Sequence, residues 1–329
     1  MNIPSNLLKA ITQNNSFIAH AHLGPDADSI GSTLALKLGL ESIGKVVTIY
    51  CEDEIPDFAN FLPQINTFEI GSMREIFASN PADVYLSLDS AAWKLVTHDL
   101  PIPDLRLPLI NIDHHPSNQL SRDLSWIDPQ SSSTAEMVFH LLNELEINIT
   151  SEIATCLLFG ILGDTGAFQN LNTDGNSLRV AALLIDKGAS YSHCVVELTR
   201  SHPFADLQVW SRLLKNLQIS TDGSFVYTSL SSQDIEELGH SPQIGLFANS
   251  IIGKVKGTKF GAVLIEKKPN SVKGAIRARS TETDVSQIAA LINGGGHPGA
   301  AGFKIEKPLK DAITDFLNAV EHLQKQGKI

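Results

Sequence analysis

Residues 22–32, HLGPDADSIGS, place three potential metal ligands within seven residues. His22, Asp26 and Asp28 follow directly on the apolar run FIAHA. Mixed Asp and His ligands without thiolate favour Mn²⁺, Mg²⁺ or Fe²⁺ over structural zinc. An acidic turn at the start of a helix would need no metal. The stretch is therefore either a polar turn or half of a metal site.

Similar polar residues follow other apolar runs. SLDS contributes Asp89, NIDHHP contributes Asp113, His114 and His115, and GILGDTGAF places Asp164 on a Gly-flanked turn. In open α/β sheets, ligands bind beyond the carboxyl ends of the strands, so we expect these side chains to converge. Converging carboxylates repel one another unless cations neutralise them. His20, on the same face of its strand as His22, is predicted to be a buried neighbour.

The elements that must position these residues alternate between strand and helix patterns. The predicted strands are short runs rich in Val, Ile and Leu, as buried parallel strands require. The predicted helices show apolar positions at helical spacing. The pattern predicts an α/β, doubly wound, mostly parallel sheet. The strands are expected at 17–21, 46–50, 84–89 and 107–113, and the helices at 29–43, 133–145 and 151–162, after a short amphipathic N-terminal helix.

The second half of the chain has a different organisation. Residues 190–218 have a helical pattern interrupted near Pro203, which suits a linker. Strand-like runs separated by helical segments then predict a smaller α+β domain that closes with a helix after Pro308. We therefore predict domains at 1–189 and 219–329, joined by a helical linker at 190–218.

Composition and net charge limit the classes of ligand and the cellular location that we expect for this protein. The net charge of −11 gives no overall attraction to long nucleic acids. The residues from Ser250 to Lys310, however, carry eleven Lys or Arg against four Asp or Glu, which suggests a small anionic ligand. The three widely separated cysteines fit neither a disulfide framework nor a zinc site and indicate a reducing, cytoplasmic location. No signal peptide or membrane span is predicted.

A glycine-rich stretch, NGGGHPGAAG, begins at Asn293. The backbone amides of Gly294, Gly295 and Gly296 could approach an anion closely, and His297 could donate to it. Arg277 and Arg279 alternate along one predicted strand and could bind phosphate together. The alternatives are a glycine turn that ends a helix and arginines on a solvated edge.

The four motifs HLGPDADSIGS, LDS, DHHP and GDTGAF, in this order, resemble those of the DHH phosphoesterase family. The segment from GAIRARS to INGGGHPGAAGF resembles the DHHA1 domain of the same family. The likeness extends from about residue 15 to 305, and its arrangement is most similar to the oligoribonuclease/pAp-phosphatase type. A homodimer is expected only by this resemblance.

The resemblance implies two divalent cations, Mn²⁺ first among them, with Mg²⁺ or Fe²⁺ as alternatives. A water between the two cations would attack the phosphorus. Asp113 and His115 would support the ligands and contact phosphate, while the glycine-rich loop and the two arginines would bind the nucleotide. One cation is implied at His22, Asp26 and Asp89, and the second at Asp28, Asp89, His114 and Asp164.

We therefore expect a hydrolase that releases 5′-mononucleotides from RNA of a few nucleotides and also converts pAp to AMP. The nearest alternative is a phosphodiesterase for pApA or cyclic di-AMP. A RecJ-like single-strand DNA exonuclease is disfavoured because no additional nucleic-acid-binding module is evident. A pyrophosphatase of the same family would lack the GGGH loop. A non-catalytic nucleotide-binding protein would be expected to lack a ligand, and every implied ligand is present.

Overall fold

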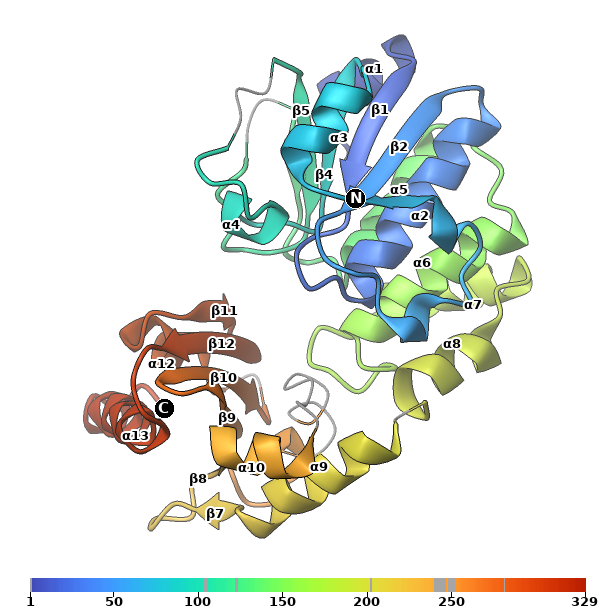
Figure 1. Ribbon diagram of the computed structural model, residues 1–329. Coiled ribbons are helices and arrows are strands. Elements are labelled where there is room, and N and C mark those ends of the chain that lie inside the picture. Colours follow the sequence, from blue (N-terminus) through green and yellow to red (C-terminus); the bar gives the residue numbers. More distant parts are fainter. Residues whose placement is uncertain are drawn as a thin grey trace. The chain divides into compact units, whose positions relative to one another are not determined.

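The computed structural model describes residues 2–102, 106–121, 124–201, 203–239, 247, 252–280 and 282–329. The chain divides into two compact units, Met1–Ser201 and His202–Ile329 (Figure 1). The division falls inside the predicted linker, and the helices α8 (Tyr191–Thr199) and α9 (Phe204–Lys215) lie on either side of it.

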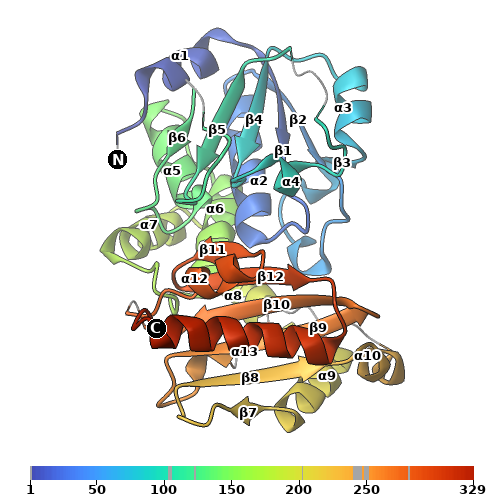
Figure 2. The ribbon, with the colours of Figure 1, turned by 90° about the vertical axis from the view of Figure 1, so that its left-hand side faces the viewer.

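A parallel sheet of six strands forms the centre of the first unit (Figure 2). The strand order is β3–β2–β1–β4–β5–β6, and each neighbouring pair is parallel. The apolar pattern predicts β1, β2, β4 and β5 correctly but does not predict the short β3 and β6. The strands are β1 (Ser16–His20), β2 (Val46–Cys51), β3 (Phe68–Ile70), β4 (Val84–Leu88), β5 (Leu109–Asp113) and β6 (Trp126–Ile127).

Helices cover both faces of this sheet, as the doubly wound prediction requires (Figure 2). Successive residues of β1 point to opposite faces: Phe17 and Ala19 join the larger core with α2, α5 and α6, and Ile18 joins the smaller core with α3. The helices of this unit are α1 (Ser5–Gln13), α2 (Ala27–Ser42), α3 (Met73–Ser79), α4 (Trp93–Val96), α5 (Thr134–Glu144), α6 (Ser151–Asp164), α7 (Gly175–Asp186) and α8, with 3₁₀ turns η1 (Asp57–Ala59) and η2 (Ile65–Thr67).

Glycines allow α2 and α6 to pack with almost no side chain between them. A Cβ atom at Gly31 would lie 2.4 Å from the carbonyl oxygen of Cys156. A Cβ atom at Gly160 would lie 2.9 Å from Asp28 Oδ1. Both distances are shorter than a carbon atom tolerates. The close approach therefore fixes the first turn of α2, which carries Asp28, against α6.

The second unit contains a mixed sheet of order β11–β12–β10–β9–β8–β7, in which β8 and β9 are parallel and the other pairs antiparallel. One face packs on α12 and α13, and the other on α9. The two sheets confirm the predicted fold class. The elements are β7 (Gln218–Ile219), β8 (Phe225–Leu230), β9 (Phe260–Lys268), β10 (Ser271–Ala278), β11 (Gly295–His297), β12 (Ala300–Ile305), α10 (Ser232–Leu238), α12 (Ser286–Leu291), α13 (Leu309–Lys325) and η3 (Ile252–Lys254).

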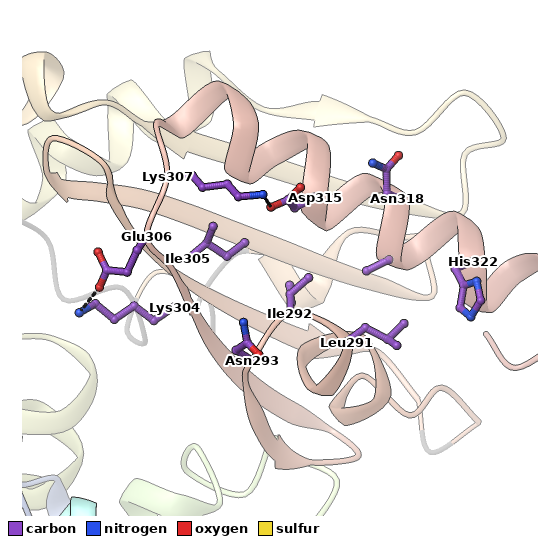
Figure 3. A pocket seen from close by; sticks show the side chains of 11 residues that line it. Leu291, Ile292, Asn293, Lys304, Ile305, Glu306, Lys307, Asp315, Asn318 and His322 are labelled. Carbon is purple, nitrogen blue, oxygen red and sulfur yellow. Dashed lines mark hydrogen bonds and ion pairs between the residues drawn. The ribbon is translucent and has the colours of Figure 1, made fainter.

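A surface pocket of about 790 Å³ lies between β12 and α13 in the second unit (Figure 3). Ile305 and two lysines, Lys304 and Lys307, are among the residues that line it. Lys304 Nζ lies 2.6 Å from Glu306 and Lys307 Nζ lies 2.7 Å from Asp315. Because both lysines are paired with carboxylates, this pocket is poorly suited to a phosphate group.

Two further sequence predictions concern the whole chain. Cys51, Cys156 and Cys194 are free thiols, as the sequence predicts, and all three are buried. Over the part of the chain that the structure describes, none of the helices combines the length and the apolar character of a membrane span.

Candidate metal centre

The turn between β1 and α2 carries the first candidate ligands. Gly24 adopts a left-handed φ of 61°, and its amide donates to Asp53 Oδ2 at 2.7 Å. Asp26 caps α2, because its Oδ1 accepts hydrogen bonds from the amides of Asp28 and Ser29 at 3.1 and 3.0 Å. The Asp26 side chain is 55% exposed, whereas Asp28 is buried. The cap therefore fixes one carboxylate at the surface and the next one inside.

His22 lies at the edge of this turn with its ring directed by the backbone. Its Nδ1 is 3.0 Å from the carbonyl oxygen of Leu23, which leaves Nε2 facing two carboxylates. Nε2 lies 3.6 Å from Asp26 Oδ1 and 3.6 Å from Asp89 Oδ2. His20, two residues earlier, is buried as predicted. Burial, and then the charge of His22, lower the pKa of His20 to about 3, so His20 is neutral.

Asp89 follows β4 in an unusual backbone conformation. Its φ of 52° lies in the left-handed region, which is costly for a residue with a Cβ atom. Its amide donates to the carbonyl oxygen of Ile112 at 3.0 Å, and its side chain is 3% exposed. Strain of this kind persists only where the surroundings hold it. The turn therefore directs a buried carboxylate toward the histidines.

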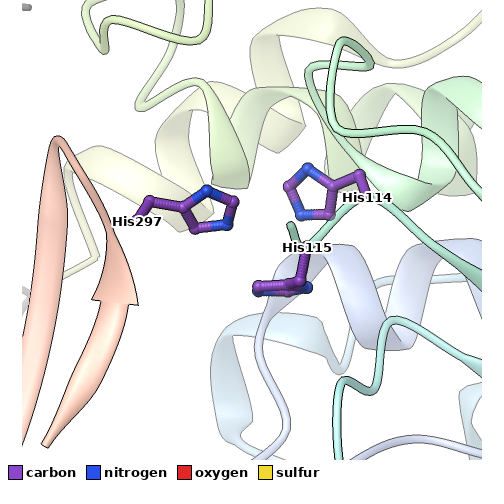
Figure 4. Close-up of side chains that lie close together, drawn as sticks. All are labelled: His114, His115 and His297. Atoms are coloured by element: carbon purple, nitrogen blue, oxygen red, sulfur yellow. The ribbon is translucent and has the colours of Figure 1, made fainter. Parts of the chain in front are cut away.

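Two histidines, His114 and His115, follow β5 (Figure 4). Their hydrogen-bond partners differ. His114 Nδ1 lies 3.3 Å from the carbonyl oxygen of Ser131, which directs Nε2 to within 3.6 Å of Asp89 Oδ1. His115 Nδ1 lies 2.7 Å from Asp113 Oδ1. The two rings have their centroids 4.6 Å apart. His114 is thus oriented as a ligand, and His115 is oriented by Asp113.

Asp164 reaches the centre from a helix and not from a strand. It is the last residue of α6, so the expectation of a turn after an apolar segment holds only in part. Asp164 Oδ2 lies 3.3 Å from His114 Nε2. Asn170 and Asn172 donate to the carbonyl oxygen of Asp164 at 2.8 and 3.3 Å. These bonds fix the end of the helix.

The donor set fits divalent cations. The ligand atoms of His22, Asp26 and Asp89 lie within 4.8 Å of one another, and so do those of Asp28, Asp89 and His114. Donors on one octahedral cation are about 3 Å apart at right angles and about 4 Å apart across the ion. The separations of 3.3–3.6 Å between donor atoms fall within that range. Asp89 belongs to both sets, one oxygen facing each.

The electrostatics of the centre call for added positive charge. Burial, and then the charges of Asp89 and Asp164, raise the pKa of Asp28 well above its usual range. Burial and Asp89 do the same for Asp164. Burial alone would lower the pKa of His22, but Asp26 and Asp89 raise it to about 9. A cation bound here would therefore relieve the repulsion between the carboxylates and would compete with protons for these groups.

Protonation also distinguishes His115. Burial opposes its charge, but the hydrogen bond to Asp113, together with the charges of Asp89 and Asp113, raises the pKa of His115 to about 10. The same hydrogen bond and that of Asn118 overcome the effect of burial and lower the pKa of Asp113. His115 is therefore an imidazolium, which suits contact with a phosphate oxygen.

The first turn of α5 is part of the centre, although the sequence analysis does not single it out. The amides of Thr134 and Ala135 donate to Asp28 at 2.7 and 2.8 Å. The Thr134 hydroxyl donates to Asp89 Oδ1 at 3.0 Å. The available signal is SSSTAE, a helix N-terminus that can bind anions. Because this segment is 106 residues from Asp28 in sequence, only the fold relates them.

The predicted nucleotide-binding residues lie in the second unit. Arg277 is on β10 and half-buried, whereas Arg279 follows the end of β10 and donates to the carbonyl oxygen of Val255 at 3.2 Å. Gly295 and His297 bound β11, which pairs with β12 from Gly302 to Ala300. The expected glycine loop is therefore largely an edge strand.

Gly294, just before β11, and the two glycines of β11 differ in why they are needed. A Cβ atom at Gly294 would lie 2.2 Å from the carbonyl oxygen of Gly302, and Gly296 has φ of 143°. Packing and backbone conformation account for these two. Gly295 has no heavy atom within 4 Å of its would-be Cβ position, so a ligand can approach its backbone. Of the three, it is the best candidate for anion contact.

Comparison with known proteins agrees with this architecture. The family model described as the DHH family, N-terminal domain, matches residues 16–161, and the DHHA1 domain matches residues 222–326. A bifunctional oligoribonuclease and PAP phosphatase NrnA of Thermus thermophilus is 32% identical over 99% of this chain and 95% of its own length. The protein of the same name from Bacillus subtilis is 26% identical over 91% of this chain and 92% of its own.

A solved structure shares the fold. The crystal structure of an exopolyphosphatase-related protein from Bacteroides fragilis superposes with a TM-score of 0.88 and covers 99% of each chain. Its sequence identity to this chain is 24%, so the likeness concerns the fold alone.

Proposed function

The chain belongs to the DHH family, with a DHHA1 domain in its second half, and is a phosphoesterase; from this premise we propose that it hydrolyses short oligoribonucleotides to 5′-mononucleotides and pAp to AMP. Relatives that carry the corresponding name align over nearly the whole chain. The observation that carries the proposal is the convergence of two Asp/His groups on a shared Asp89.

We infer two divalent cations, Mn²⁺ first among them, with Mg²⁺ and Fe²⁺ as alternatives. Such a pair, when bound, supplies a water of lowered pKa and neutralises the charge that develops on the phosphoryl group. The donor distances support both positions, and the raised carboxylate pKa values support the one that includes Asp28 and Asp164. His22, Asp26 and Asp89 would hold one cation, and Asp28, Asp89, His114 and Asp164 the other.

The protein's own residues would orient the substrate around these positions. His115, kept protonated by Asp113, would donate to a non-bridging oxygen of the scissile phosphate. Arg277, Arg279 and the amide of Gly295, with Gly294, Gly296 and His297 beside it, would bind a second phosphate of the nucleotide. Two phosphate contacts suit a substrate with more than one phosphate, such as pAp or a dinucleotide.

A substrate panel tests this proposal. The metal-free protein is assayed with pAp, pApA, cyclic di-AMP, a 5-mer RNA, single-stranded DNA and pyrophosphate, with Mn²⁺ and with chelator. We expect the 5-mer RNA and pAp to be hydrolysed with Mn²⁺ only. Pyrophosphate as the best substrate would overturn the nucleotide assignment. If cyclic di-AMP or pApA is preferred, the protein is a dinucleotide phosphodiesterase and not an oligoribonuclease. Activity that survives thorough chelation would overturn the assignment of the metal ions.

A further inference from the structure

A chain of buried hydrogen bonds connects side chains of β2, β4 and β1 to the turn that carries Asp89. Tyr50 Oη lies 3.1 Å from Tyr85 Oη, which lies 2.8 Å from His20 Nδ1. His20 Nε2 lies 2.9 Å from Ser90 Oγ, and this hydroxyl donates to the carbonyl oxygen of Leu88 at 3.1 Å. All four side chains are fully buried.

The protons in this chain can be assigned. Since Ser90 donates to Leu88, its Oγ must accept from His20 Nε2–H. A neutral imidazole then has an acceptor at Nδ1, so Tyr85 donates to it and accepts from Tyr50. In this direction every N–H and O–H has an acceptor. The opposite direction would leave the Tyr50 proton in the core without one, which is unfavourable.

The chain ends at the strained turn that carries the shared candidate ligand. Leu88 and Ser90 flank Asp89, whose φ is 52°. The Ser90 carbonyl oxygen also accepts from the side-chain amides of Asn111 and Asn118, at 3.3 and 3.2 Å. Two asparagines therefore hold the backbone of Ser90 in this turn, and His20 holds the Ser90 side chain. Such holding is what a left-handed non-glycine residue needs in order to persist.

We propose that His20 is a positioning residue for metal binding: by donating to Ser90, it keeps the Leu88–Ser90 turn in the conformation that presents one Asp89 oxygen to each cation position. This inference rests on the metal-binding part of the proposed function. Its bland alternative is that His20 merely fills the core, with ring centroids 5.5 Å from Tyr85 and 6.0 Å from Tyr50. An apolar side chain would fill that space without burying two polar nitrogens.

Two polar substitutions separate these readings. His20→Gln can place an amide nitrogen near the Nε2 position and keep the donor to Ser90. His20→Asn can keep a partner for Tyr85 at the Nδ1 position but is too short to reach Ser90. Ser90→Ala removes the receiving hydroxyl, and Tyr50→Phe removes only the outermost bond as a matched control. For each metal-free variant, the Mn²⁺ dissociation constant is measured by calorimetry, and the melting temperature without metal is recorded.

We expect His20→Asn and Ser90→Ala to weaken Mn²⁺ binding about 10-fold, as loss of supporting hydrogen bonds typically does. His20→Gln and Tyr50→Phe should remain within about threefold of the parent. In a double-mutant cycle, adding His20→Asn to Ser90→Ala should weaken Mn²⁺ binding little further, because both substitutions remove the same hydrogen bond.

Unchanged Mn²⁺ affinity in folded His20→Asn and Ser90→Ala, whatever their melting temperatures, would overturn the positioning role. Equal losses of Mn²⁺ affinity in His20→Gln and His20→Asn, with unchanged affinity in Ser90→Ala, would also overturn the positioning role and would assign His20 to core packing. If His20→Asn does not fold, Ser90→Ala decides alone by the same criterion. These titrations contain no nucleotide, so they test only the role of His20. The proposed function is tested independently by the substrate panel with the parent protein.

Discussion

The Thr134 hydroxyl donates to Asp89 Oδ1 at 3.0 Å, while the amide of the same residue donates to Asp28 Oδ2 at 2.7 Å. One residue at the start of α5 thus orients both buried carboxylates that the second candidate metal position requires. The helix N-terminus also places a partial positive charge beside them. This charge lowers the cost of burying two acids together before any cation binds.

Thr134→Val should weaken Mn²⁺ binding and lower kcat by about 10-fold each, because the variant removes a hydrogen bond to a candidate ligand and keeps its shape. The backbone amides that hold Asp28 remain, so the fold should persist. Thr228→Val is the matched control: its buried hydroxyl donates to a backbone carbonyl in the second unit. Equal effects of the two variants on Mn²⁺ affinity would contradict the role given to Thr134.

Asp89→Asn should abolish measurable binding of at least one Mn²⁺ and reduce turnover by at least about 100-fold, since one side chain serves both candidate positions. Calorimetric stoichiometry and turnover of pAp are the measurements. Asp186→Asn, at an exposed position of α7, controls for the loss of one charge. A variant that keeps two bound Mn²⁺ ions would show that Asp89 is not shared.

Much of the centre could be predicted from sequence because two simple rules apply to it. Apolar runs of Val, Ile and Leu end in polar residues at His22, Asp89 and Asp113, and the carboxyl ends of parallel strands meet at one edge. The residues that orient these ligands by hydrogen bonds could not be predicted from the sequence. Thr134 has only the general signal of a helix N-terminus, and Ser90 is a single short hydroxyl side chain, so only the fold relates them to their partners.

Two local structures differ from expectation for physical reasons. The helix predicted at 151–162 continues to Asp164, so this residue ends α6 and does not yet lie on the expected turn, because an apolar pattern does not fix a helix end to the residue. Gly295 and Gly296 belong to the edge strand β11 because they pair with β12, and Phe303 and Gly302 leave no room for a side chain at Gly294 just before it. A glycine-rich sequence predicts a loop even where close packing requires glycine in a strand.

The metal-free protein should lose stability as the pH rises from about 6.5 to 9. His22 and His115 have pKa values of about 9 and 10 in the folded protein, against 6.5 when unfolded. A raised pKa contributes stability that is complete below the unfolded value and is lost as the pH rises through the folded one. Melting temperatures with chelator should fall over this interval, and saturating Mn²⁺ should reduce the fall. A rise with pH in chelator would contradict this prediction.

Gly31→Ala should destabilise the protein by about 1–3 kcal/mol, because the new methyl group would press on the Cys156 carbonyl where α2 meets α6. Denaturant unfolding measures this change. Gly175→Ala is the control, since its Cβ atom would meet only the flexible Arg179 side chain, at 3.2 Å. If Gly31→Ala is as stable as Gly175→Ala, the tight contact between the two helices is not needed to hold the first turn of α2.

Arg277→Lys should raise the KM for pAp by about 10-fold and leave kcat within about threefold, if Arg277 binds a phosphate that is not cleaved. Lysine keeps the charge but loses the planar fork that holds two phosphate oxygens at once. Arg279, which already donates to Val255 and lies beyond the end of β10, should show a smaller effect on the same substitution. Arg179→Lys on α7 serves as the control for a general loss of guanidinium groups. A fall in kcat at unchanged KM would instead place Arg277 at the reacting phosphate, and no change in either would leave the phosphate contact to the amide of Gly295.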